Sequence, residues 1–151
     1  METQYHKFYS KEKIERPVVL LIRAAIKAGF FKEKEFNKKL EILNSLHKAL
    51  CEFYKLDVIK VNVIENYLGT GKYNWILKEI FIDKISLVTY LHEFYHYKAM
   101  SLNQKENTED NARGWSISLF YLATPNLCRT AIENNKIMHQ TKFIEEVKEN
   151  G

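Results

Sequence analysis

The spacing of apolar residues along the chain changes twice, and this limits the folds open to it. Within residues 11–28 and again within residues 33–54, apolar residues recur every three or four positions, which predicts two amphipathic helices. Pro17 lies in the first turns of the first helix, where a missing N–H is tolerated, and Gly29 ends that helix. We therefore expect a helical hairpin over residues 1–56, with residues 1–10 as an arm.

After Leu56 the apolar period shortens to two. Val61 and Val63 alternate with polar residues, and a Gly-Thr-Gly turn at 69–71 precedes a second apolar stretch, which predicts two or three antiparallel strands within residues 57–83. Helical spacing then returns, with Asp83 or Ser86 as the N-cap of a helix over residues 87–100. A further helix is expected from about residue 109 to Thr124, and a last one over about 126–137.

These segments together predict the fold class. At 151 residues and 46% hydrophobic content, the chain has enough apolar material for one core. We expect a helix-rich α+β single domain of residues 1–151, in which a small antiparallel sheet packs against the helices that follow it. Its parts are the hairpin 1–56, the strand region with two helices 57–125, and a C-terminal helix and tail 126–151.

Composition excludes several functional classes. Lys and Glu are interspersed along the chain and Arg is rare, which disfavours a nucleic-acid partner. The apolar run 18–22 is too short for a signal-peptide core or a membrane span, so we expect a cytoplasmic protein without a membrane partner. Only three of the nineteen acids are Asp, and the only cysteines are Cys51 and Cys128, so an acidic metal cluster or a thiolate site is disfavoured.

The segment His92-Glu93-Phe94-Tyr95-His96 contains the pattern His-Glu-x-x-His. On a helix, residues four apart lie one turn apart on the same face, so both imidazoles can reach one zinc ion. Glu93 is rotated by about 100° from His92, yet it is close enough to act as general base on a water at the metal. We therefore expect a metal site on this helix.

A catalytic zinc site uses three protein ligands and keeps one position open. Glu109 is the first choice for the third ligand, because the small Ala112 lets its helix approach the histidine helix and Trp115 anchors it. Glu106 is the second choice and His139 the third. The sheet would then pack against both an active-site helix and a glutamate helix.

The pattern His92-Glu93-x-x-His96 followed by Glu109-x-x-Ala112-x-x-Trp115 resembles the gluzincin class of zinc metallopeptidases, including the ImmA/IrrE-like, HtpX-like and archaeal minigluzincin peptidases. The resemblance spans roughly residues 70–125. It implies a zinc metalloendopeptidase, a hydrolase of protein or peptide substrates. His92, His96 and Glu109 would be its Zn²⁺ ligands and Glu93 its general base. The strand around residues 73–83 would be the edge strand that binds an extended substrate, through Tyr73, Trp75 and Ile76.

This sequence departs from the pattern of those families in two positions. Tyr95 stands where a small residue is usual, and Arg113 stands where an Asp or Asn often supports a ligand histidine. The donor to the developing oxyanion is also open among Tyr97, Tyr121, Arg113 and His139. An inactive metallopeptidase-like binding or regulatory module is therefore an alternative. So are a zymogen whose cleft is covered by the N-terminal hairpin or by the C-terminal tail, and a SprT-like site with His139 as ligand. A homodimer through the N-terminal helices is also left open.

Overall fold

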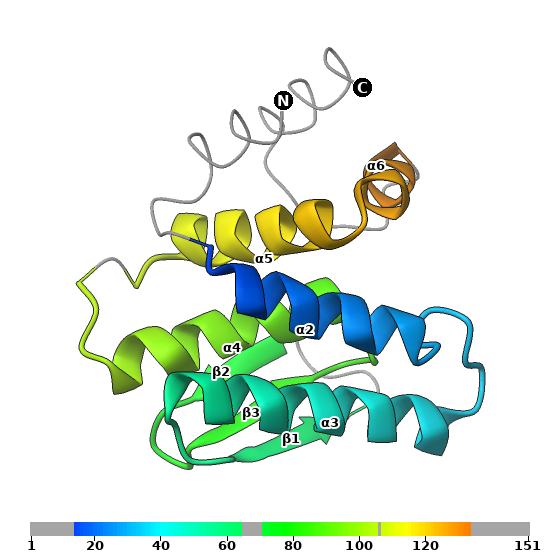
Figure 1. Ribbon diagram of the computed structural model, residues 1–151. Coiled ribbons are helices and arrows are strands. Elements are labelled where there is room, and N and C mark those ends of the chain that lie inside the picture. Colours follow the sequence, from blue (N-terminus) through cyan, green and yellow to red (C-terminus); the bar gives the residue numbers. More distant parts are fainter. Residues whose placement is uncertain (1–13, 65–70, 106, 134–151) are drawn as a thin grey trace.

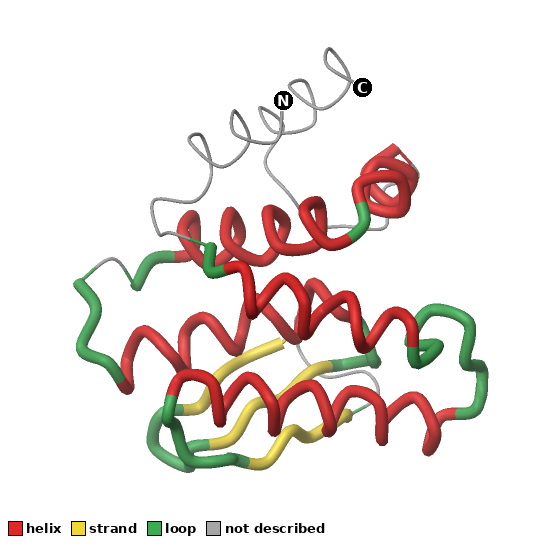
Figure 2. The backbone as a smooth tube through the Cα atoms, in the orientation of Figure 1, coloured by secondary structure: helices red, strands yellow, loops and turns green. Residues whose placement is uncertain are grey.

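The computed structural model describes residues 14–64, 71–105 and 107–133, and these residues form five helices and three strands (Figures 1 and 2). The α+β class predicted from the sequence is confirmed. The elements follow one another as α2 (Arg16–Lys27), α3 (Phe36–Tyr54), β1 (Lys60–Val63), β2 (Gly71–Asn74), β3 (Glu79–Ile82), α4 (Leu87–Ser101), α5 (Glu109–Ala123) and α6 (Pro125–Glu133).

Helices α2 and α3 form the expected hairpin and pack against each other. Pro17 lies in the first turn of α2, and Gly29 follows that helix with a φ of 101°, a value that glycine adopts without strain. Helix α3 ends at Lys55, which takes the left-handed conformation with a φ of 58°. The two helices begin a few residues later than the periodicity predicts; residues 11–13 lie outside the described part of the chain.

The three strands form a mixed sheet in the order β1-β3-β2, so the expectation of an all-antiparallel sheet was wrong for one of its two pairings. Strands β2 and β3 form an antiparallel hairpin, whereas β1 runs parallel to β3 with Val61 opposite Ile80. Alternation along a strand predicts which side chains face the core, but the same faces result from either strand direction. The segment 73–83, expected to be one edge strand, contains the end of β2, a turn and β3. Of these two strands, only β2 lies at the edge of the sheet; β3 is its central strand.

Helix α4 lies between the sheet and α5, and α2 spans α3 and α5 (Figure 1). The N-cap of α4 is Ser86, whose side chain accepts a hydrogen bond from the Thr89 N–H. Because α4 is covered on several sides, it is buried around most of its circumference, and the Phe94 ring stacks on Trp115 of α5 with 6.3 Å between centroids. Helix α4 is therefore packed against the sheet on one side and against α5 on the other.

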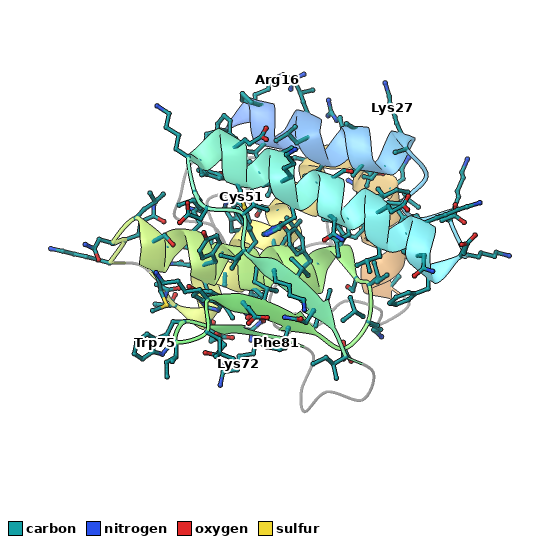
Figure 3. All side chains as sticks on the ribbon, turned by 90° about the horizontal axis from the view of Figure 1, so that it is seen from below. Arg16, Lys27, Cys51, Lys72, Trp75 and Phe81 are labelled. Carbon is teal, nitrogen blue, oxygen red and sulfur yellow. The ribbon has the colours of Figure 1, made fainter. Side chains whose placement is uncertain are left out.

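The opposite face of the sheet is not covered by any helix of the described residues. Figure 3, which views the molecule from below, shows Lys72 and Phe81 on this face and Trp75 at the end of the hairpin. None of the described helices has both the length and the apolar character needed to cross a lipid bilayer.

Candidate metal centre

Helix α4 places the two histidines of the motif one turn apart at the mouth of a cleft. Their ring centroids are 5.1 Å apart, and each side chain is about one-sixth exposed, at 16% for His92 and 15% for His96. The intervening Tyr95 points the other way, into the core, where its ring lies 5.6 Å from that of Trp115. A bulky residue at this position is therefore accommodated without blocking the cleft.

Glu109, the first residue of α5, brings its carboxylate to both histidines. The distance from His92 Nε2 to Glu109 Oε2 is 3.1 Å, and that from His96 Nε2 to Glu109 Oε1 is 2.7 Å. One ligand atom from each of the three residues lies within 4.8 Å of the others. The approach depends on α5 packing closely on α4, where Ala112 and Trp115 are fully buried. Two nitrogens and one oxygen therefore converge on a single point.

The contact of His96 with Asn107 leaves its second ring nitrogen directed at Glu109. Its Nδ1 lies 2.7 Å from Asn107 Oδ1, and because a carbonyl oxygen only accepts, Nδ1 donates this hydrogen bond. Its Nε2 is buried and makes no hydrogen bond of acceptable geometry with the described residues, although a Glu109 oxygen is 2.7 Å away. A ring nitrogen and a carboxylate oxygen this close attract each other when a proton on Nε2 or a metal cation lies between them. The donor set fits a divalent metal.

Electrostatics keeps two of the three ligand candidates in the state that binds a metal. Burial lowers the pKa of His92 more than the contact with Glu109 raises it, so this imidazole is neutral at pH 7. Burial alone would raise the pKa of Glu109, but His92 and His96 outweigh it and hold the pKa of this carboxyl below its usual range. Two imidazoles and one carboxylate are a ligand set that zinc uses in catalytic sites.

Glu93 lies beside these three residues and is 7% exposed. Burial raises its pKa to about 7, an effect that the nearby His96 opposes. The backbone N–H of Tyr73 on β2 donates a hydrogen bond to this carboxylate. A carboxyl with a pKa near neutrality is suited to take up and release a proton in this pH range.

The cleft next to Glu93 has a volume of about 280 Å³ and lies between β2, the end of α4 and the start of α5. Of the three residues expected to bind substrate, Tyr73 lines it, whereas Trp75 and Ile76 lie in the turn after β2 and are exposed. The lining residues are Gly71, Lys72, Tyr73, Glu93, His96, Met100, Asn107 and Glu109.

Four cleft residues were not identified from the sequence: Gly71, Lys72, Met100 and Asn107. Gly71 and Asn107 bear most directly on the site. A Cβ on Gly71 would lie 3.0 Å from Thr89 Cγ2 and 3.1 Å from Glu93 Cγ, so the missing side chain lets β2 approach the general-base candidate. The Gly-Thr-Gly pattern predicted only a turn there. Asn107 lies in the polar break before α5, and its position two residues ahead of Glu109 was the only signal that could have indicated it.

The remaining candidates divide into those placed elsewhere and those outside the described residues. Glu106 and His139 belong to the latter group. The Tyr97 hydroxyl donates to the Asp57 carbonyl oxygen at 2.6 Å, Tyr121 accepts from Arg129, and Arg113 pairs with Asp110 at 3.4 Å. None of these three residues lines the cleft, so the donor to an oxyanion is not identified among them.

Comparisons of this chain with protein-family models, with curated proteins and with solved structures found no match. The assignment of the site therefore depends on its own geometry.

Proposed function

We propose that this protein is a zinc-dependent endopeptidase whose metal ligands are His92, His96 and Glu109 and whose general base is Glu93. The observation that carries the proposal is the convergence of three ligand atoms within 4.8 Å, beside a buried carboxylate whose pKa is about 7. A metal centre alone would not require a proton acceptor in contact with it. The two features together favour hydrolysis over a purely structural site.

The chemistry divides between the ion and the protein. Bound zinc would polarise the scissile carbonyl and lower the pKa of a water molecule. Glu93 takes a proton as the water oxygen adds to the carbonyl carbon, and it delivers that proton to the leaving nitrogen as the C–N bond breaks. Glu93 lies beside His96, and burial raises its pKa to about 7 in the metal-free chain. A nearby zinc ion would favour the ionised form, which is the form that accepts the proton.

Strand β2 supports the choice of an extended peptide as substrate. Within the part of the chain that the structure describes it is an edge strand, so one side of its backbone has no sheet partner there, and the Tyr73 N–H points toward Glu93. The N–H and C=O of a strand residue point to the same side, so we expect the Tyr73 carbonyl to be accessible from the cleft. A peptide adding to this edge would pass directly in front of Glu93.

The proposal includes a cytoplasmic location. Cys51 and Cys128 are buried and unpaired, and burial raises the pKa of the Cys51 thiol to about 11 and that of Cys128 to about 12. Thiols of this kind persist unoxidised in a reducing compartment.

The test combines metal analysis with cleavage of an unfolded protein such as reduced, alkylated casein. We expect one zinc per chain, lost in His92→Ala and Glu109→Ala. Glu93→Gln should keep the zinc and lose at least about 100-fold in cleavage rate, because general acid–base catalysis contributes about that much or more. Glu52→Gln, an exposed change on α3, is the matched control and should cleave like the wild type. Full cleavage by Glu93→Gln would rule out Glu93 as the base.

A second candidate is a metal-binding module that holds peptides without cleaving them. The observation that favours it is the engagement of Tyr97, Tyr121 and Arg113 away from the cleft, which leaves the oxyanion donor unassigned. Stoichiometric zinc with peptide binding, but no cleavage by the wild type, would favour this candidate. Cleavage by the wild type that Glu93→Gln abolishes would exclude it.

A further inference from the structure

Among the described residues, six of the twelve exposed large apolar side chains belong to segments at one end of the molecule. They come from the last turn of α4 and from three connections that lie together at that end in Figures 1 and 2: residues 55–59 before β1, the turn 75–78 between β2 and β3, and the segment after α4. The turn contributes Trp75, Ile76 and Leu77, which are 60%, 74% and 57% exposed. We name these six residues the loop patch: Val58, Trp75, Ile76, Leu77, Met100 and Leu102.

Side chains of α4 fix the three connections relative to one another. The Tyr97 hydroxyl donates to the Asp57 carbonyl oxygen at 2.6 Å, and its ring lies 5.3 Å from that of Tyr73 on β2. Lys98 donates to Gln104 Oε1 at 3.0 Å and lies over the ring of Tyr54 at the end of α3. The loop patch is therefore a defined surface, because buried anchors hold each of its segments in place.

The turn that carries the three largest exposures is also held in one conformation. Asn74 Oδ1 accepts hydrogen bonds from the N–H groups of Ile76 and Leu77, both at 3.0 Å. Lys78 completes the turn in the left-handed conformation with a φ of 56°. Its apolar side chains therefore project together from the end of the hairpin, as Figure 3 shows for Trp75.

The charges around the loop patch are mostly positive. The described residues of the three connections, the adjoining strands and the last turn of α3 include three acids, Glu52, Asp57 and Glu79, and Glu79 accepts a hydrogen bond from Asn62. Of the acids at the start of α5, Glu109 lies at the metal centre and Asp110 pairs with Arg113. Five exposed lysines surround the patch: Lys55, Lys60, Lys72, Lys78 and Lys105.

We propose that the loop patch docks this protein on an anionic membrane surface. Trp, Ile and Leu at the end of a hairpin can enter the headgroup region, where Trp is enriched, while a surrounding ring of lysines attracts anionic lipids. A protein partner is disfavoured because protein interfaces are depleted in Lys and enriched in Arg, and the described residues of the three connections and the adjoining strands include five exposed lysines and no arginine. Apolar groups this exposed and this clustered indicate a binding surface.

The docking surface adjoins the cleft without being part of the metal centre. Met100 belongs to both, since it lines the cleft beside Lys72 and is 41% exposed. In a docked molecule, the mouth of the cleft would lie next to the lipid surface. The inference does not depend on zinc or on peptidase activity, so the two proposals can fail separately.

Co-sedimentation with phosphatidylcholine vesicles, with and without phosphatidylglycerol, tests the proposal. We expect binding only to the anionic vesicles. In the triple variant Trp75→Ser/Ile76→Ser/Leu77→Ser, the affinity for these vesicles should fall at least about tenfold. Lys78→Gln should weaken binding about fivefold, the equivalent of one lysine at an anionic surface. The matched control is Leu20→Ser/Phe36→Ser, which removes two comparably exposed apolar side chains from α2 and α3 and should bind like the wild type.

Tryptophan emission gives a second readout. The chain has two tryptophans, and Trp115 is only 1% exposed, so a blue shift on adding anionic vesicles would report Trp75. Absence of binding to anionic vesicles at low salt would overturn the proposal, as would equal loss of binding in the Leu20→Ser/Phe36→Ser control. Binding of unfolded casein, but not of vesicles, through Trp75, Ile76 and Leu77 would also overturn it and assign the patch to protein recognition.

Discussion

Glu93 is held in a state that costs stability when no metal is bound. Burial raises its pKa to about 7, so at pH 8, where the carboxyl is ionised, its charge is less stable in the folded chain than in the unfolded chain. Unfavourable local arrangements of this kind are typical of functional sites, where the surrounding fold maintains them. This cost is measurable by substitution of the single residue.

The stability of the metal-free protein should increase in Glu93→Gln at alkaline pH. The pKa of Glu93 is about 7 in the folded chain and 4.5 without the fold, so the folded state binds the proton more tightly. The wild type therefore loses stability as pH rises from 4.5 through 7, whereas the amide does not titrate. Urea unfolding at pH 8 should show the variant about 1–3 kcal/mol more stable, with no such gain at pH 4. An equal gain at both pH values would contradict the origin assigned to the pKa shift.

Asn107 should determine how tightly the metal is held. Its Oδ1 accepts from His96 Nδ1 and so keeps Nε2 directed at Glu109. Loss of such a supporting contact weakens metal binding about 10- to 100-fold, so we expect Asn107→Ala to release zinc at a correspondingly lower chelator concentration. Lys105→Ala, an exposed change in the same connection, is the control and should leave the zinc affinity unchanged. Wild-type affinity in Asn107→Ala would remove the positioning role.

At the level of elements, α4 carries the cleft residues and also contacts the sheet, α3 and α5. Two residues before His92, the Tyr90 hydroxyl donates to His47 Nδ1 at 2.6 Å. The other ring nitrogen, Nε2, then carries a proton and donates to the Ile59 carbonyl oxygen at 2.7 Å. His47 thus connects α3, α4 and the segment before β1 while remaining neutral.

The contact between α3 and α4 should weaken in acid. Burial lowers the pKa of His47 below the 6.5 of an exposed histidine, so the unfolded chain binds its proton more readily. The contribution of His47 to stability is complete above pH 6.5 and is lost as pH falls through its lower folded value, by up to about 1.4 kcal/mol per pH unit.

The measurement is the difference in unfolding free energy between wild type and His47→Gln, followed from pH 7.5 to 5. This difference removes the contributions of His92 and Glu93, which titrate in both proteins. The neighbours Cys51 and Tyr90 do not interfere, because burial raises the pKa of Cys51 to about 11 and that of Tyr90 well above 10. A difference that stays constant across this range would contradict the prediction.

For the whole molecule, the metal centre connects two consecutive helices, α4 and α5. His92 and His96 belong to α4, whereas Glu109 begins α5, and the two helices also share the stacked Phe94 and Trp115 rings. A ligand that binds only the folded chain stabilises it by an amount that depends on its concentration. Zinc should therefore act on the fold as a whole.

Zinc should raise the thermal unfolding temperature. At a free zinc concentration 100 times its Kd, binding to the folded state contributes about 2.7 kcal/mol. For a chain of this size that corresponds to a rise of about 5–10 °C, lost on adding a chelator. His92→Ala should show no rise, whereas His47→Gln, which leaves the metal ligands intact, should show the full one. A rise in His92→Ala equal to that of the wild type would place the zinc elsewhere.

The sequence by itself determined the features that depend on neighbours along the chain. Helical spacing located the helices, including α4 with either Asp83 or Ser86 as its cap, of which the structure has Ser86. The pattern His92-Glu93-x-x-His96 placed two imidazoles on one face because the geometry of a helix turn is local. Features that join distant segments were decided by the tertiary structure. Packing decided that β1 runs parallel to β3, that Glu109 and Asn107 meet His96, and that three connections form one apolar surface. Periodicity records which face of an element is buried, but the partner of that face depends on contacts across the whole fold.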